Sequence, residues 1–263
     1  MSSTPSARRY WLLMWSLLLS LPAVIWFSGI NLFATMPLDS LLAQGLYWLT
    51  STGTAPYGVL TVLAIYALSY RCLPKKHFTA LVLSVAVAMV SSLTLNQFLK
   101  PFFSEARPNA VLLQDQGLLN TKQFYMQEKA DRQQQITVAT EQYLQQTDAI
   151  ELSDNIKQHW LHEVGFAFPS GHTLFAVSLS LVVSYFFVIA GQWWLPSILI
   201  VWTWLMGISR MVLGMHWSQD VLASSIIGGL IALFSLYWVL RWQTHWTRRY
   251  PATHKTFDSE LPK

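Results

Sequence analysis

The residues best suited to chemistry stand where an apolar run begins. The stretch FAFPSGHTLFAVSLSLVV ends as an ordinary membrane-helix sequence, but Ser170, Gly171 and His172 precede that part. Pro169 stops an incoming helix, serine is a favoured N-cap, and glycine lets a ligand approach the backbone closely. The free N–H groups and positive dipole end of the next helix would then form an anion site. A well-capped helix also explains the serine, but it does not explain the histidine.

A second set of candidate residues follows in the next apolar stretch. Arg210 lies in WTWLMGISRMVLGM, where an unpaired arginine costs about 2.5–3.5 kcal/mol or more, so we expect it to face a polar cavity or an anion. His216 alone would more often be structural than catalytic. Asp220 stands four residues later, a spacing that permits a hydrogen bond on a helix, and this favours a chemical role.

A third set, His159 and His162, forms an HxxH pair that is typical of some metal sites. No third ligand follows at a convincing spacing. We therefore expect no metal here, and no cofactor elsewhere in the chain.

The elements that position these residues are predicted to be membrane helices. Only 11% of the 263 residues are charged and 53% are hydrophobic, against about 25% charged in soluble domains. The apolar blocks are near the roughly 20 residues that cross a bilayer. The first is interpreted as a retained helix rather than a signal peptide, because its apolar stretch is long and no cleavage site follows. The predicted fold class is all-α, a polytopic membrane protein with six spans at about 10–30, 55–72, 78–98, 173–190, 194–214 and 221–240.

Basic residues predict how the chain is oriented. With six spans, the basic clusters fall on one side, which should be cytoplasmic. Both termini would then be cytoplasmic and the opposite face periplasmic. The clusters contain Arg8, Arg9, Arg71, Lys75, Lys76, Arg241, Arg248, Arg249, Lys255 and Lys263.

The hydrophilic block 100–169 falls on the predicted periplasmic face. It has no Gly or Pro from Gln123 to Val164, which favours helices, so we predict a small helical cap in preference to a solvated linker. A further short interfacial helix is expected over 37–50. The chain is thus divided into 1–99 with spans one to three, 100–169 as the cap, 170–241 with spans four to six, and 242–263 as a cytoplasmic tail.

Span order brings the candidate residues to one membrane face. Lys100 and Arg107 follow span three, the Ser170 group opens span four, and Arg210 to Asp220 joins spans five and six. Lys100 alone would be a snorkelling anchor. Together, three cations, two histidines and a carboxylate indicate a tetrahedral oxyanion, namely phosphate near the membrane surface. The modest net charge of +4 does not favour nucleic acid binding, and the single Cys72 excludes an intrachain disulfide.

These residues resemble the signature of the type 2 phosphatidic acid phosphatases, which share a core with vanadium haloperoxidases. That signature is KxxxxxxRP, PSGH and SRxxxxxHxxxD. The chain has KPFFSEARP from Lys100, PSGH from Pro169 and SRMVLGMHWSQD from Ser209, in the same order.

The resemblance implies a role for each residue. His216 would be the nucleophile, oriented by Asp220, and His172 the general acid that protonates the leaving lipid oxygen. Glu163, just before the second motif, would contact the head group. The phosphate would be bound by Lys100, Arg107, Ser170, Gly171 and Arg210.

The implied activity is that of a lipid phosphatase of the phosphatidylglycerophosphatase or undecaprenyl-diphosphate phosphatase type. It would face the periplasm from the inner membrane, with lipid phosphates and the bilayer as its partners and no obligate protein partner. Candidate substrates are phosphatidylglycerol phosphate, undecaprenyl diphosphate, phosphatidate and diacylglycerol diphosphate. A phosphotransferase from undecaprenyl diphosphate to another lipid, and a non-enzymatic lipid-phosphate transporter, are the alternatives. Six spans argue against a soluble haloperoxidase.

Overall fold

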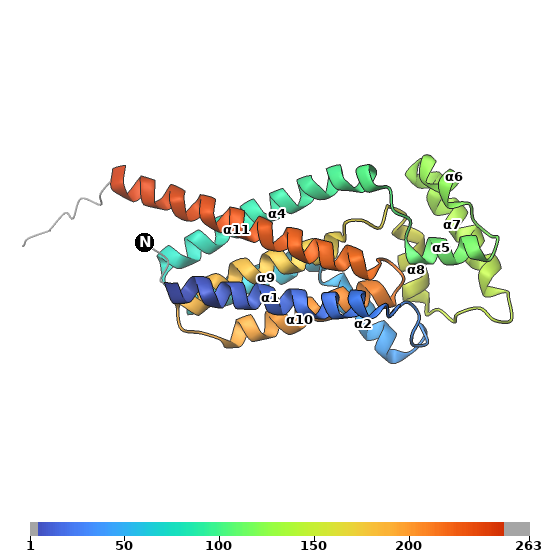
Figure 1. Cartoon of the computed structure of the whole chain (residues 1–263), viewed down its shortest axis with the longest axis horizontal. Coiled ribbons are helices and arrows are strands. Elements are labelled where there is room, and N and C mark those ends of the chain that lie inside the picture. Colours follow the sequence, from blue (N-terminus) through green and yellow to red (C-terminus); the bar gives the residue numbers. More distant parts are fainter. Residues whose placement is uncertain (1–4, 250–263) are drawn as a thin grey trace, which may run out of the picture.

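A computed structural model describes residues 5–249 as a helical bundle with a small helical cap at one end (Figure 1). The only β-type pairing in these residues is an isolated bridge between Leu38 and Leu152. The long helices are α1 (Pro5–Ser28), α3 (Tyr57–Cys72), α4 (Lys75–Phe103), α9 (Gly171–Ile189), α10 (Trp194–Val212) and α11 (Ser218–Arg249), and the short ones are α2 (Leu41–Ser51), α5 (Pro108–Asp115), α6 (Thr121–Met126), α7 (Lys129–Leu144) and α8 (Asp154–His162).

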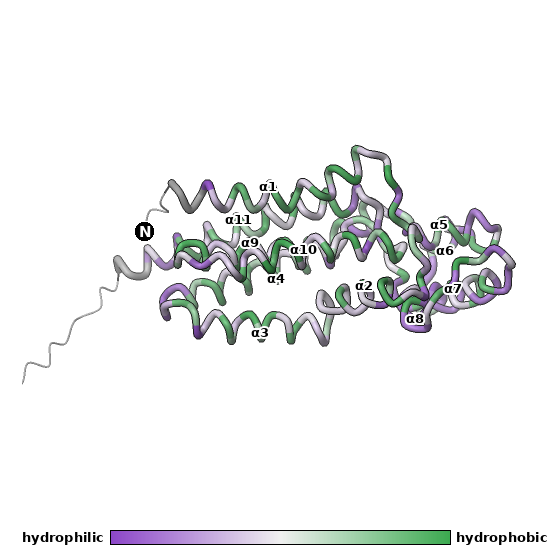
Figure 2. The backbone as a smooth tube through the Cα atoms, turned by 90° about the horizontal axis from the view of Figure 1, so that it is seen from below, coloured by the Kyte–Doolittle hydropathy of each residue, from purple (hydrophilic) through white to green (hydrophobic). Residues whose placement is uncertain are grey.

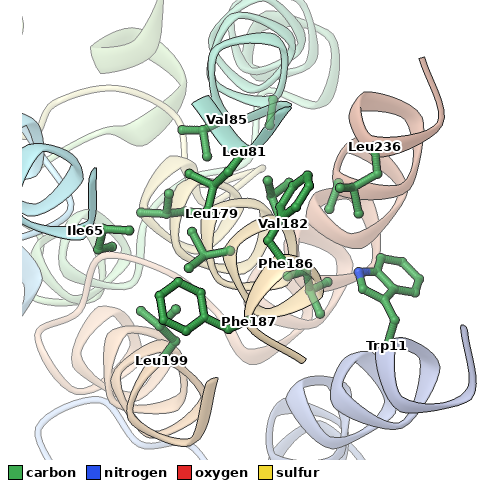
Figure 3. Packing of buried hydrophobic residues seen from close by; sticks show 14 of the residues in the cluster. Trp11, Ile65, Leu81, Val85, Leu179, Val182, Phe186, Phe187, Leu199 and Leu236 are labelled. Atoms are coloured by element: carbon green, nitrogen blue, oxygen red, sulfur yellow. The ribbon is translucent and has the colours of Figure 1, made fainter. Parts of the chain in front are cut away.

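Helix α9 forms the centre of the bundle. It contacts α1, α4, α10 and α11, and most of its side chains are buried. Figure 3 shows Leu179, Val182 and Phe186 of α9 surrounded by side chains of the neighbouring helices. The helix that carries the PSGH motif at its start is thus the most buried of the candidate membrane spans.

Small and hydroxyl-bearing residues let the helices approach one another. Ser180 bonds Thr203 of α10 at 2.7 Å between their hydroxyl oxygens. Gly228 of α11 lies against Val177, and Gly229 leaves no room for a side chain beside Trp15 of α1. Such contacts hold membrane helices together because lipid tails provide little hydrophobic drive between helices. The small-residue stripe in α11 therefore serves packing within the chain.

Five of the described helices are long and apolar enough to cross a membrane, and α3 is a shorter apolar helix. The fold class is therefore confirmed as an all-helical integral membrane protein. Helix α3, at the position of the predicted second span, has 16 residues. Helix α4 extends past residue 99, so Lys100 lies on its last turn, and α11 continues to Arg249, beyond the expected end at 240.

The loops at the end of the bundle opposite the cap lie together. The Gln192 side chain, between α9 and α10, donates to the carbonyl of Cys72, the last residue of α3, at 3.0 Å. Helix α1 begins and α11 ends at this same end of the bundle (Figure 1). The basic residues Arg9, Arg71 and Arg241 thus lie on one side. Lys255, Lys263 and the tail from residue 250 on lie outside the described residues.

The hydrophilic block 100–169 is helical, as its lack of Gly and Pro predicts. Helices α5, α6, α7 and α8 form the cap, which is visibly more hydrophilic than the bundle (Figure 2). Its own apolar centre contains Leu113, Phe124 and Ile136. Helix α2, where a short helix was expected, packs against α8 and α10. The cap is therefore a folded unit resting on one end of the bundle.

Candidate active site

A cavity of about 540 Å³ opens where the cap meets the bundle. Its polar end is lined by six of the nine predicted site residues, whereas its other walls come mainly from α3 and α4, with residues 53–55 and Phe175 of α9. Ser170, Arg210 and Asp220 lie behind this lining and are fully buried. The six are Lys100, Arg107, Glu163, Gly171, His172 and His216.

The start of α9 has the N-terminal geometry that the sequence predicts. Ser170 is the N-cap, and its Oγ accepts from the Thr173 amide at 3.4 Å and from the Thr173 hydroxyl at 2.9 Å. Its own O–H proton is left to donate. A Cβ on Gly171 would lie 3.3 Å from Nδ2 of Asn96, so glycine keeps this helix end open to the cavity.

A tight turn after α10 places His216 at the same cavity as the start of α9. Gly214 has a φ of +71°, which is strained for other residues. The chain then folds back, and the amides of Met215 and His216 donate to the Arg210 carbonyl at 3.0 and 3.1 Å. The Asn109 amide of α5 donates to the Gly214 carbonyl at 3.0 Å. This turn therefore joins the third motif to the end of the first.

His216 and Asp220 are adjacent and buried at the start of α11. Nδ1 of the histidine lies 3.6 Å from Oδ2 of the aspartate, which is longer than a hydrogen bond. The same Oδ2 accepts the Trp217 amide at 2.8 Å. The aspartate thus faces one ring nitrogen, as predicted, and a small ring rotation would close the hydrogen bond.

Arg107 is held by the protein on every nitrogen of its guanidinium. Nε donates to the Gly165 carbonyl at 2.7 Å and Nη2 to Glu163 Oε2 at 2.8 Å. Nη1 contacts the Met215 sulfur at 3.2 Å. Lys100 donates to the Phe166 carbonyl at 3.0 Å. The first motif is therefore fastened to the segment that leads into the second.

Arg210 is held on one side only. Its Nη1 donates to Nε2 of His159 at 2.8 Å and to Oγ1 of Thr50 at 3.2 Å. Its Nε and Nη2 are buried and have no hydrogen-bond partner among the described residues. The side-on edge of this buried arginine therefore keeps two donors that the described residues do not use.

The cations around the cavity act on the neighbouring ionisable groups. Burial, then the charges of Arg210 and Arg107, holds the pKa of His216 well below its ordinary value. Burial raises the pKa of Glu163, but the charges of the two arginines outweigh it and hold that pKa well below its usual range. Burial and Arg210 lower the pKa of His159 to about 3. His216 and His159 are therefore neutral at physiological pH, and Glu163 is ionised.

The sequence did not single out three residues that lie at this site. His159 stands out in the sequence only as half of an HxxH pair, yet it accepts a hydrogen bond from Arg210, whereas His162 faces the Gln158 carbonyl. Thr50 and Asn96 carry no motif at all. Within residues 5–249, no group of three or more metal-ligating side chains gathers. Thr50 stands near the end of a largely apolar helix, and no spacing links it to Arg210.

Comparison with known proteins shows which proteins this chain is similar to. The PAP2 superfamily matches residues 81–244. Phosphatidylglycerophosphatase B of Escherichia coli (strain K12) is 32% identical over 222 residues, which are 81% of each chain. The Haemophilus influenzae protein of that name is 32% identical over 203 residues, 73% of this chain and 81% of the relative. A PAP2-type phosphatidylglycerolphosphate phosphatase structure from Bacillus subtilis gives a TM-score of 0.49 at 17% identity, covering 92% of this chain and 98% of the other.

Proposed function

The chain belongs to the PAP2 superfamily, and we propose that it is a membrane phosphatase that removes phosphate from lipid phosphates through a phosphohistidine. The observation that carries the proposal is one cavity with two ends. Two histidines and the cations Lys100 and Arg107 line its polar end, and mostly apolar side chains, the majority from α3 and α4, line the rest. A lipid phosphate has the same two parts, a charged head group and an apolar acyl chain.

In the proposed first step, His216 attacks phosphorus through Nε2. Its Nδ1 faces Asp220, which leaves Nε2 as the nitrogen for attack, and its lowered pKa keeps that nitrogen unprotonated. The P–N bond forms as the P–O bond to the lipid breaks. The aspartate stabilises the positive charge that develops on the ring.

The leaving lipid oxygen needs a proton, and His172 is the proposed donor. It occupies the first turn of α9, and its Nε2 is buried with no hydrogen-bond partner among the described side chains and backbone. A lipid alkoxide is a poor leaving group unless it is protonated as it departs. In the second step, His172 takes a proton from water while that water attacks the phosphohistidine and restores His216.

The phosphoryl oxygens would be bound by donors that the protein leaves unused. These are the Nε and Nη2 edge of Arg210, the Ser170 hydroxyl and the Gly171 amide, with Lys100 and Arg107 adding positive charge. Phosphoryl transfer depends mostly on positioning and charge stabilisation, so this set can act without a metal. Glu163 is the proposed head-group contact, since its side chain remains 28% exposed beside Arg107.

The acyl chains would lie between α3 and α4. Val59 and Leu63 of α3 and Leu93 of α4 line the cavity there, and all three are exposed on the surface that would face lipid. A substrate could therefore enter sideways from the bilayer without leaving it. The proposed orientation follows the basic residues: termini in the cytoplasm, cap and cavity at the periplasmic face of an inner membrane.

Phosphate release by the purified protein tests the proposal. The substrates are phosphatidylglycerol phosphate, undecaprenyl diphosphate, phosphatidate and diacylglycerol diphosphate, with His216→Ala as the control. We expect release from at least one lipid, label trapped on His216 after acid-free quenching, and little effect of EDTA. Label recovered on a second lipid instead of as free phosphate would indicate a phosphotransferase. Absence of both release and label would leave a transporter as the better explanation.

A further inference from the structure

Arg210 is oriented by two side chains outside the three motifs. His159 of cap helix α8 and Thr50 of α2 both accept from the same nitrogen, Nη1, at 2.8 and 3.2 Å. Thr50 directs its own proton toward the Met206 sulfur at 3.6 Å, which leaves its lone pairs for the arginine. Arg210 and Thr50 are fully buried. Two acceptors therefore fix one corner of the guanidinium.

The position of that corner determines what the rest of the guanidinium can bind. A guanidinium is planar, and its Nε–H and one Nη2–H lie side by side on the edge away from Nη1. These are the two nitrogens without a partner among the described residues. Holding Nη1 thus presents the side-on edge, whose spacing suits two oxygens of one phosphate.

We propose that His159 is a positioning residue, which acts on phosphate only by orienting this edge of Arg210. The inference rests on the proposed function, because it assigns Arg210 to the phosphoryl group. It also makes the cap part of the phosphate site: His159 of α8 holds Arg210, and Glu163, the residue that follows α8, holds Arg107.

The histidine can perform this role only as a neutral acceptor. An arginine donates and never accepts, so Nε2 of His159 must carry a lone pair and Nδ1 the proton. Burial and the charge of Arg210 lower the pKa of His159 to about 3, which maintains this state. The ring of Tyr47 contacts the imidazole edge-on, with centroids 5.6 Å apart, and restrains its rotation.

Helix α8 does not depend on His159 for its docking. The next residue, Trp160, is fully buried and donates from Nε1 to the Leu213 carbonyl at 2.9 Å. Ile156 packs in the same apolar cluster. A change at position 159 should therefore leave the cap in place and affect chiefly the arginine.

The test compares His159→Leu with His159→Gln, each in the wild-type and in the Arg210→Ala background. Leucine removes the acceptor, whereas glutamine supplies one through Oε1. Misplacement of a charged group by about 1 Å can cost on the order of 10²-fold, so we expect His159→Leu to lower kcat/KM by about 10–100-fold and His159→Gln by less than about 5-fold. His162→Leu is the matched control on the same helix, because its ring faces the Gln158 carbonyl, and it should retain full activity.

The Arg210→Ala background separates positioning from a structural role. If His159 acts only through Arg210, His159→Leu should cause no further loss there, since the two changes remove one interaction. An equal loss in both backgrounds, or a His159→Leu enzyme as active as wild type, overturns the inference. If the wild type releases no phosphate from any lipid, the proposed function fails. Orthovanadate binding, measured by thermal shift, then tests the positioning alone, and unchanged binding in His159→Leu overturns it.

Discussion

The bundle and the cap both line the same cavity, but they contribute to it in different ways. The bundle supplies the atoms that would react or bind phosphate, and it places them through helix ends: Ser170 caps α9, and the Gly214 turn sets His216. The cap supplies side chains that hold other side chains. His159 holds Arg210, and Glu163 holds Arg107.

Residues of the bundle would therefore perform the reaction, and residues of the cap would orient them. Loss of a bundle residue should remove a step of the reaction, whereas loss of a cap residue should leave the step possible but poorly aligned. Arg107 lies between these cases, because all three of its guanidinium nitrogens have protein partners. Variants of the two kinds should therefore differ in how much activity they lose.

His216→Ala should abolish turnover, with a loss of about 10⁴-fold or more in kcat, because removal of a nucleophile leaves only the contribution of binding. Phosphate release in detergent measures it, and size-exclusion chromatography checks the fold. His162→Ala serves as a control on the cap side. Activity within tenfold of wild type in the purified variant would refute the assignment of the nucleophile.

Arg210→Ala should lower kcat by about 10²–10³-fold, the usual cost of one oxyanion donor, while the protein stays folded. Arg107→Ala should also lower the thermal midpoint, and by more than Arg210→Ala does, because it leaves the partly buried Glu163 carboxylate without its partner. Rates and thermal midpoints of both variants are compared. Equal midpoints would mean that the two arginines are held alike, contrary to their contacts.

Val62→Trp should narrow the apolar part of the cavity and raise KM for long-chain lipid phosphates by about 10-fold. That estimate corresponds to losing the burial of one or two methylene groups, at about 0.8 kcal/mol each. A short-chain, water-soluble phosphate ester should be hydrolysed as before. Ile198→Trp, on an exposed face of α10 away from the cavity, is the matched control. An equal effect on both substrates would argue against acyl binding between α3 and α4.

The His159→Gln variant should lose less stability than the wild type when the pH is lowered. The folded pKa of His159 is about 3 and the unfolded value is about 6.5. The unfolded chain therefore binds a proton between these values that the folded chain does not, so stability falls as pH falls through that window. The thermal midpoint should drop less from pH 6.5 to 4.5 in the variant. The surrounding charges, which stay in both proteins, are Arg210, Glu163, Arg107 and His162. Parallel curves would contradict the depressed pKa.

Much of the fold was predictable because a membrane helix is a local property. An apolar block of about 20 residues must satisfy its backbone internally wherever it lies in the chain, so the long helices and the helical cap followed from composition. Helix ends were less predictable. Helix α11 continues past 240 because no Gly or Pro interrupts it before Pro251, and Lys100 belongs to α4 because Pro101 is tolerated near its end.

The motif residues were predictable for a related reason, since the number of spans between them assigns them to one face. The residues that orient Arg210, namely His159 and Thr50, were not predictable from the sequence. His159 lies 51 positions from Arg210 in the chain, and Thr50 lies 160, and neither has a spacing that marks it. Their partner is set by how α2 and α8 pack on α10, which depends on side-chain shape across three separate elements.

The sequence alone therefore determined the membrane helices, the common face of the three motifs and the capped start of α9, because apolar length, span order and N-cap chemistry all act over short stretches. Only the tertiary structure decided which donors are consumed and which are left for phosphate. The sequence predicts that Arg107 and Arg210 both bind phosphate, yet one is bonded on all its nitrogens and the other keeps its side-on edge. That outcome depends on acceptors contributed from distant segments, and a hydrogen bond forms only where packing brings them within about 3 Å.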